Sequence, residues 1–362
     1  MNRRLVVVAG IAAAGAGATA VGLRRMGSMD GYGASVEAIR AELAVQPDMP
    51  EFIRFASLAP SGHNAQPWRY RVAPGRIDIL PDFARRTPVV DPDDHHLFAS
   101  LGCAAENLTL ALRARGRLGE PRFDAAGDGS ISIDHEAGRA DASPLFEAIA
   151  HRQSTRADYD GRPVSAADLR RLVRAAEVPG VDLELVSERA RIDRVRDLVV
   201  AGNGTQMADA AFVRELRSWL RFSPCEAIES GDGLFGAASG SPTMPAWLGP
   251  HVFDWVFRAQ AENDKYARQL QSSAGVAVFV SRQDDQDHWV RAGRACQRFA
   301  LQATALGIKH AFINQPVEVT GLRPDLAALV GMPGRRPDIV MRFGYGPTLP
   351  FSARRPVGGL MA

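Results

Sequence analysis

Apolar residues along the chain follow two spacings, which together predict an α+β fold. Short stretches rich in β-branched and aromatic residues favour strands, and they cover residues 68–72, 77–80, 131–133, 181–186, 276–281 and 339–343. Other stretches repeat apolar residues at helical spacing, and they include residues 52–58, 97–115, 145–151, 166–177 and 192–200. Helices that alternate with strands in this way are expected to pack on a sheet.

Two of the helical stretches match each other in sequence, 101–116 with 292–307. Both end at a glycine, which suits the position after a helix C-terminus. A shorter match pairs 37–39 with 147–149, so its members lie much closer together along the chain. The separation between matching segments thus grows by roughly 80 residues, which indicates two copies of one unit with an insertion in the second copy.

The insertion would lie mostly between residues 201 and 270. It contains the glycine-rich loop 231–236 but no Gly-Lys-Ser/Thr signature, so a phosphate-gripping loop is not expected there. We interpret it as a lid or a dimer arm.

The N-terminus differs from the rest of the chain. Arg3 and Arg4 precede an uncharged apolar run over residues 5–23, and Arg24 and Arg25 follow it. This order is typical of an export signal, and the paired arginines partly resemble a twin-arginine leader. The run is also long enough for a membrane anchor. We therefore expect an exported or membrane-anchored protein, with a cytoplasmic protein carrying an apolar leader as the alternative.

Composition excludes several classes of function. The 43 basic and 41 acidic residues leave a net charge of +2, which argues against a nucleic-acid partner. Apolar residues make up 46% of the chain, as in ordinary globular proteins. The three cysteines are far apart, and the eight histidines show no metal-binding spacing. We expect no metal site.

Two short motifs carry candidate chemistry. Residues 59–68 read Ala-Pro-Ser-Gly-His-Asn-Ala-Gln-Pro-Trp, a loop of hydroxyl and amide side chains able to bind the edge of a planar heterocycle, or an ordinary helix–strand turn. Residues 152–156 read Arg-Gln-Ser-Thr-Arg. In an extended segment Arg152, Ser154 and Arg156 share a face and form a phosphate cradle. The alternative is a solvated basic stretch.

Together these motifs resemble the FMN-dependent nitroreductase family. The Arg-x-Ser-x-Arg motif is followed by Tyr-Asp-Gly-Arg-Pro-Val at 159–164, and Ile-Asn-Gln-Pro occurs at 313–316. The arrangement is similar to the fused, two-copy Acg-type branch of the family, over about residues 35–357. The resemblance implies a tandem pair of units, each a mostly antiparallel sheet flanked by helices, that form an intrachain pseudo-dimer.

The resemblance also implies roles for particular residues. Arg152, Ser154 and Arg156, joined by Arg354, would bind the FMN phosphate. The other expected contacts are with the flavin ring, from Ser61, Asn64 and Gln66, and from the backbone of Asn314 and Gln315 beside flavin N5. No catalytic side chain is required, because the flavin itself carries the redox chemistry.

Each copy is expected to hold a different part of the site. If 37–39 and 147–149 correspond, the first copy has Glu42, Ala44 and Gln46 where the second copy has the phosphate cradle. The second copy passes from Pro179 almost directly into a strand and lacks the 59–68 loop. One composite flavin site per chain follows. The expected division is a leader at 1–33, a first half at 34–140 and a second half at 141–362.

The function implied is hydride transfer from NAD(P)H through FMN to a nitroaromatic, a quinone or a similar small-molecule acceptor. The alternative is an FMN storage protein, in which the insertion blocks nicotinamide and turnover. The chain would be a monomer that acts as a pseudo-dimer, or a weak homodimer.

Overall fold

The computed structural model describes residues 26–362, apart from the side chains of residues 254 and 256. The apolar run at 5–23 and its flanking arginines therefore lie outside the described residues. The first helix, α2 (Met29–Ile39), belongs to the folded body, because Tyr32 is fully buried and its hydroxyl donates to the Phe351 carbonyl at 2.6 Å. No helix within residues 26–362 combines the length and the apolar character needed to cross a membrane.

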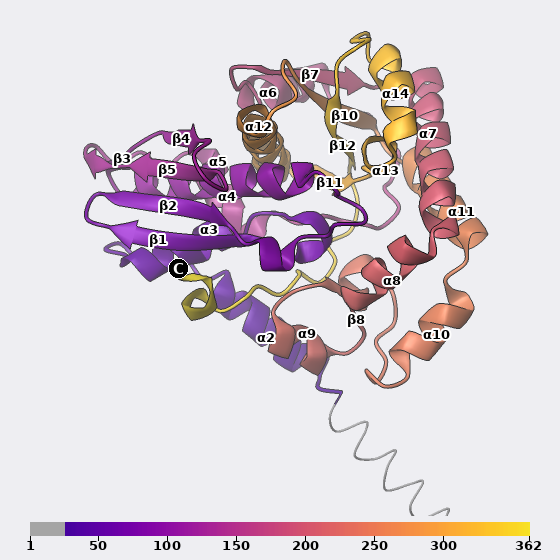
Figure 1. Cartoon of the computed structure of the whole chain (residues 1–362), viewed down its shortest axis with the longest axis horizontal. Helices are drawn as coiled ribbons and strands as arrows, with labels where there is room; N and C mark the ends of the chain where they lie inside the picture. The colour runs from indigo at the N-terminus through magenta and orange to yellow at the C-terminus, as the bar shows by residue number, and fades with distance from the viewer. Residues whose placement is uncertain (1–25) are drawn as a thin grey trace, which may run out of the picture.

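Two four-stranded antiparallel sheets share the same strand order (Figure 1). The spatial order of the first is β1 (Trp68–Ala73), β2 (Arg76–Pro81), β5 (Ser130–Asp134) and β4 (Pro121–Asp124). The order of the second is β7 (Val181–Val186), β10 (Gly275–Ser281), β12 (Pro337–Gly344) and β11 (Lys309–Phe312). In each half, the chain forms two neighbouring antiparallel strands, then a long helix, and then two more strands. In the sheet, the fourth strand lies between the second and the third. The predicted α+β fold and all six predicted strands are confirmed.

A long helix packs on each sheet, and the two helices cross each other. α4 (His95–Ala114) and α12 (Gln286–Ala305) have 20 residues each, and they contain the two matching segments 101–116 and 292–307. A Cβ atom on Gly102 would lie 2.0 Å from the Val290 carbonyl oxygen, and one on Gly293 would lie 1.9 Å from the Ala99 carbonyl oxygen. The backbones therefore touch, and the contacts are reciprocal, because Gly102 and Gly293 occupy matching positions in the two segments.

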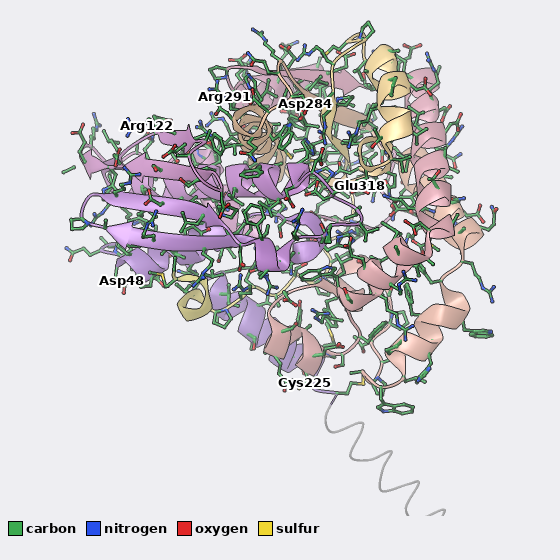
Figure 2. All side chains as sticks on the ribbon, in the orientation of Figure 1. Asp48, Arg122, Cys225, Asp284, Arg291 and Glu318 are labelled. Carbon is green, nitrogen blue, oxygen red and sulfur yellow. The ribbon has the colours of Figure 1, made fainter. Side chains whose placement is uncertain are left out.

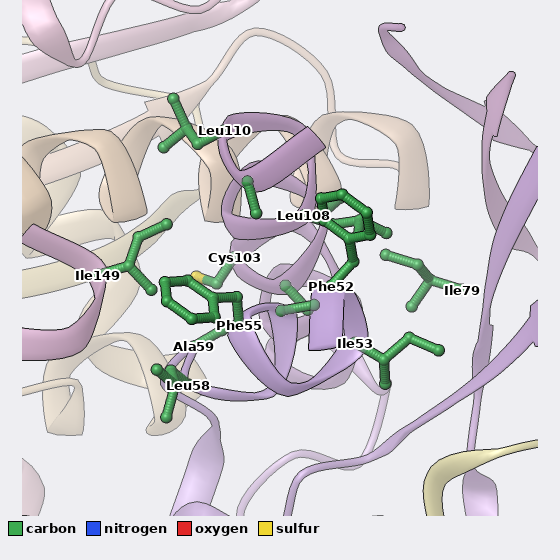
Figure 3. Packing of buried hydrophobic residues seen from close by; sticks show 14 of the residues in the cluster. Phe52, Ile53, Phe55, Leu58, Ala59, Ile79, Cys103, Leu108, Leu110 and Ile149 are labelled. Carbon is green, nitrogen blue, oxygen red and sulfur yellow. The ribbon is translucent and has the colours of Figure 1, made fainter. Parts of the chain in front are cut away.

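The first sheet buries one face only. Ile77, Ile79, Ile131 and Ile133 are fully buried and pack with α3 (Met49–Ser57) and α4. Figure 3 shows Ile79 in this cluster together with residues of both helices. The opposite face is polar, where Asp78 of β2 forms ion pairs with arginines of β1 and β2. Alternation along the strand gives this arrangement.

The second sheet is covered on both faces. Along β10, Ala277 and Phe279 pack toward α12 and α6 (Ala166–Ala175), while Val276 and Val278 pack with α7 (Arg189–Ala208) and α14 (Arg323–Leu329). Every residue of β10 is buried, as expected for a continuous apolar strand between two helical layers.

The connection between the first two strands is what differs most between the halves. β1 and β2 are joined by a turn at residues 74–75, whereas residues 187–274 separate β7 from β10. This long segment comprises α7, α8 (Ala210–Ser218), β8 (Leu220–Arg221), α9 (Pro224–Ser230), β9 (Leu234–Phe235), α10 (Gly249–Val256) and α11 (Ala259–Gln271). The remaining elements are short: β3 (Arg117–Leu118), β6 (Glu136–Ala137), α5 (Pro144–Ala148) and α13 (Gln315–Glu318).

Candidate functional site

The loop at residues 58–67 joins α3 to β1 in an unusual backbone conformation. His63, Asn64 and Gln66 have positive φ angles of 49°, 55° and 53°. The Ser61 hydroxyl supports the turn by accepting from the Gln66 backbone amide at 2.9 Å. Non-glycine residues held in this region cost free energy and cluster at functional sites.

The side chains of Asn64 and Gln66 tie this loop to distant parts of the chain. Asn64 donates to the carbonyl of Gly233 at 3.1 Å, in the segment between β7 and β10. The Gln66 side chain donates to Gly231 at 2.8 Å and accepts from the Arg355 backbone amide at 2.9 Å. The two amides predicted to contact a flavin ring therefore also hold the loop in place.

Arg354 caps the C-terminal end of α3. Its guanidinium donates to the carbonyls of Ser57 at 2.8 Å, Leu58 at 3.1 Å and Ala59 at 3.2 Å, and to the Asn64 side chain at 2.9 Å. These acceptors engage all three guanidinium nitrogens. Arg354 thus lies at the predicted site. There it orients the loop by donating hydrogen bonds to backbone carbonyls.

The segment at 152–156 runs along β11 of the second sheet. Ser154 forms a parallel bridge with His310, and the Thr155 amide donates to the His310 carbonyl at 2.8 Å. Arg342 of β12 fastens the segment from the other side by donating to the Thr155 and Ala157 carbonyls at 3.1 and 2.7 Å. The sequence did not assign this clamping role to Arg342.

Arg152 is buried without a full set of partners. Only 3% of the residue is exposed, and its Nη2 donates weakly to the Leu58 carbonyl at 3.4 Å. Within residues 26–362, its buried Nε and Nη1 atoms have no partner, and neither ring nitrogen of the buried neighbour His310 has one. Burial lowers the pKa of Arg152 to about 10 and that of His310 well below its usual range. Buried polar atoms are normally paired, so these unpaired atoms mark a candidate binding site for a group from outside the chain.

The positive charge around Arg152 is not balanced by carboxylates of the described residues. Arg40, Arg156 and Arg354 are also desolvated, which lowers the pKa of each. The groups that shift the pKa values of these four arginines are tyrosines, cysteines and other arginines. Burying several cations without an acid is unfavourable. A bound anion with oxygen acceptors would compensate, and a phosphate fits this donor set.

A second group of polar side chains lies at the Arg156 end of the segment. Arg156 is close enough to His63 to lower the histidine pKa, which burial takes to about 4. The His63 Nδ1 and the Gln315 Oε1 are buried without partners in the described part of the chain. Gln315 also lies beside the Tyr266 hydroxyl, whose pKa burial raises to about 12. Loop 58–67, segment 152–156 and α13 therefore converge here.

Helix α7 lies directly on α13. A Cβ atom on Gly202 would come within 2.8 Å of the Gln315 Cβ, so only glycine allows this approach. Asn314 is fixed from the opposite side, because its Oδ1 accepts from the Val340 backbone amide at 2.9 Å. The segment between β7 and β10 thus covers the Asn314–Gln315 turn.

The structure brings together most of the predicted residues and adds others. Arg152, Arg156, Gln315 and the 58–67 loop converge, whereas Ser154 contributes mainly its backbone to the bridge with His310. The sequence missed His310, Arg40 and Tyr266, which have no local motif. Three cysteines are free thiols, and residues 26–362 contain no cluster of three His, Cys, Asp or Glu side chains able to hold a metal ion.

Known proteins were compared with the chain at the level of sequence. No family model matches it. A Mycobacterium tuberculosis protein provisionally named NAD(P)H nitroreductase Rv3131 is 28% identical over 308 residues, covering 82% of this chain and 84% of the relative. A second protein of that organism, provisionally named NAD(P)H nitroreductase acg, is 25% identical over 328 residues, covering 84% of this chain and 92% of the relative.

Solved structures align with a smaller part of the chain. A nitroreductase with bound FMN from Desulfitobacterium hafniense shares 16% identity at a TM-score of 0.37, covering 59% of this chain and 93% of that one. The FMN-dependent nitroreductase NfnB from Mycobacterium smegmatis, in complex with NADPH, also shares 16% identity at a TM-score of 0.37 and covers 60% of this chain and 91% of its own. The similarity to the mycobacterial relatives along four-fifths of the chain supports the resemblance to the nitroreductase family.

Proposed function

We propose that this protein is an FMN-dependent oxidoreductase that transfers hydride from NAD(P)H to a nitroaromatic, a quinone or a similar acceptor. FMN, when bound, supplies the redox chemistry. The names of the mycobacterial relatives give NAD(P)H as the electron donor of those proteins. Arg152 and its neighbours would hold the phosphate, while loop 58–67 and the Asn314–Gln315 turn would hold the ring.

The buried Arg152 carries this proposal. Two of its guanidinium nitrogens and both nitrogens of His310 have no partner among the described residues, and the causes of the Arg152 pKa shift include no carboxylate. A phosphate dianion supplies acceptors and negative charge at the same place. Arg40 and Arg354 lie close enough to Arg152 to add to the field.

The proposal includes one composite site per chain. The shared strand order and the reciprocal contacts of α4 and α12 support two fused copies that meet as an intrachain pseudo-dimer. The loop comes from the first half and the phosphate segment from the second. The leader, as an export signal or a membrane anchor, remains part of the proposal, and fractionation of cells that express the full chain would test it.

The visible spectrum of the purified protein tests the function. We expect a yellow protein that NAD(P)H bleaches and that an added quinone or nitroaromatic restores. A colourless preparation that added FMN does not convert would contradict flavin binding. A yellow protein that dithionite bleaches but NAD(P)H does not would indicate storage instead of turnover.

Removal of both arginines of the cradle should abolish FMN retention. We expect Arg152→Ala combined with Arg156→Ala to weaken FMN binding by at least about 100-fold, because each charge-assisted contact contributes about 1.5–3 kcal/mol. Titration followed by flavin fluorescence measures the loss. Arg122→Ala is the matched control, because Arg122 is exposed on β4 and pairs with Asp134. Equal FMN affinity in the double variant and the control would refute this placement of the phosphate.

A further inference from the structure

A buried carboxyl–imidazole pair adjoins the ring end of the candidate site. Glu318 is the last residue of α13, one helical turn after Gln315, and His96 lies in the first turn of α4. Glu318 Oε1 lies 3.8 Å from His96 Nε2. Figure 2 places Glu318 in the middle of the view, away from the rim where Asp48, Arg122 and Cys225 lie. The pair thus joins the two halves next to the Asn314–Gln315 turn.

The pair is mostly buried and keeps some accessible surface. The side chains of His96 and Glu318 retain 12% and 19% of their exposed surface. Burial nevertheless dominates the electrostatics of both groups, since it lowers the pKa of His96 to about 3 and raises that of Glu318. Both side chains are thus desolvated and still partly accessible. His63 of the loop and Arg156 of the phosphate segment are likewise desolvated and only partly buried.

The hydrogen bonds around Glu318 determine which oxygen holds the proton. Gln206 of α7 donates from Nε2 to Glu318 Oε2 at 2.6 Å, so Oε2 is an acceptor. A protonated Glu318 therefore carries its hydrogen on Oε1, the oxygen that faces His96. Burial raises the pKa of Glu318, His96 and Gln206 offset part of this rise, and Asp91 adds to it, so the net direction is upward. Burial together with His95 lowers the pKa of His96 and keeps its imidazole neutral. Neutral imidazole can accept a proton at Nε2 and release one from Nδ1.

We propose that Glu318 and His96 form the proton donor for the acceptor, with Glu318 as the store and His96 as the relay. This inference rests on the proposed function and extends it to acceptors that develop negative charge on oxygen. A quinone that receives a hydride becomes a hydroquinone monoanion, and one proton converts that oxygen to a hydroxyl. Glu318 loses this proton, becomes a carboxylate and recovers a proton from water. Gln206, which the insertion supplies, positions the carboxyl.

The first test needs no turnover. Infrared spectroscopy at neutral pH, with and without FMN, should show the carbonyl stretch of a protonated carboxyl in the difference spectrum between the unsubstituted protein and Glu318→Gln. Asp338, whose pKa burial raises to about 7, is present in both proteins, so its own band cancels in this difference. Glu177→Gln is the control, because Glu177 is exposed next to α6. A difference spectrum without this carbonyl band would overturn the proposal.

The second test separates proton delivery from electron supply. The FMN-loaded proteins are reduced with dithionite and mixed with a quinone or with ferricyanide, an electron acceptor that takes up no proton. In Glu318→Gln we expect quinone reduction to slow about 100-fold or more, as for a typical general acid, and ferricyanide reduction to be unchanged. His96→Asn should reproduce this split with Glu318 intact.

The outcomes distinguish the two hypotheses. If the unsubstituted protein binds no FMN, the proposed function fails, and with it this role for the pair. If the unsubstituted protein binds FMN but Glu318→Gln does not, Glu318 holds the cofactor and the proton-donor role is refuted. If quinone reduction and ferricyanide reduction slow to the same extent, the proton-donor role is refuted as well, because electron transfer itself would then be impaired.

Discussion

The two sheets repeat one topology but are built for different environments. Asp78 of β2 lies on an open, polar face, where Arg71 and Arg76 pair with it. The equivalent strand of the second half, β10, is buried along its whole length between α12 and the layer of α7 and α14. The extra layer comes from the segment between β7 and β10. In the sheet with one open face, a tight turn joins the first two strands. In the covered sheet, the same connection contains helices that also reach the candidate site.

The same comparison applies to the site. The first half contributes the strained loop at 58–67, and its counterpart in the second half is the short connection 176–180 between α6 and β7. The second half contributes Arg152 and Arg156, in a connection where the first half has only residues 40–48 between α2 and α3. Each half keeps the scaffold and carries one functional loop. The candidate site thus draws on one loop from each half, and the two loops lie at different positions along the shared order of elements.

We expect the largest loss of stability from substitutions at the crossing of α4 and α12, where the two halves are most alike. Gly102→Ala and Gly293→Ala would place a Cβ 2.0 Å and 1.9 Å, respectively, from a carbonyl oxygen of the opposite helix. The helices must move apart, so we expect the free energy of unfolding to fall by about 3 kcal/mol or more in both variants. Chemical denaturation measures the loss.

A glycine in a helix without such contacts provides the control for this pair. Gly204 of α7 has no atom within 4 Å of a built Cβ, and Gly204→Ala should stabilise the protein by up to about 1 kcal/mol through helix propensity. If Gly102→Ala were tolerated and Gly293→Ala were not, the two helices would not be equivalent at the crossing.

A smaller loss of stability is expected where α4 and α12 carry different residues at equivalent positions. Glu106 of α4 is fully buried and accepts from Arg294 at 3.0 Å and Arg298 at 2.7 Å. Its counterpart in the matching segment of α12 is Gln297, whose amide donates to Asn107 at 2.6 Å. Glu106→Gln should lower the free energy of unfolding by about 2–3 kcal/mol, less than a fully buried pair would because both arginines reach solvent.

Gln297→Met completes this comparison, because it removes a neutral hydrogen bond at the equivalent position. We expect it to cost about 1–2 kcal/mol, which includes the Asn107 oxygen left unpaired. Equal losses in Glu106→Gln and Gln297→Met would show that the charge at 106 adds nothing to the contact between the halves.

A pH-dependent effect on stability concerns the loop that is present in only one half. Burial depresses the pKa of His63 to about 4 in the folded protein, so the stability due to its neutral form is present above pH 6.5 and is lost as the pH falls toward 4. His63→Asn removes this contribution and tolerates the positive φ. In FMN-free protein, the fall in free energy of unfolding from about pH 7.5 to about pH 5 should be about 2 kcal/mol smaller in the variant.

Other buried groups titrate in this pH range, but they are common to both proteins and cancel in the difference. They include His95 and His96, with depressed pKa values, and Asp338, whose pKa burial raises to about 7. An identical pH dependence in the two proteins would place His63 in contact with solvent.

The sequence predicted those parts of the fold that have a strong local pattern. β10 was predicted from a continuous apolar run, and the α4–α12 pair from glycines and small residues repeated at a fixed separation. β4 and β11 were missed, because short strands with polar ends carry no period. Since β11 was missed, His310 could not be placed beside Arg152. The amides of Asn64 and Gln66 were correctly located in a loop, but their partners are set by tertiary contacts.

Residues 357–362 complete the hydrophobic core of the first half, although the first half is synthesised earlier. Leu360 is fully buried in the first core, Met361 bridges to Tyr70 of β1, and the Ala362 amide donates to the Tyr70 carbonyl at 2.8 Å. The first half therefore cannot close its core until residues 357–362 have left the ribosome. Its final packing waits for the synthesis of the second half, and a product cut short before Leu360 would leave that core open to proteolysis.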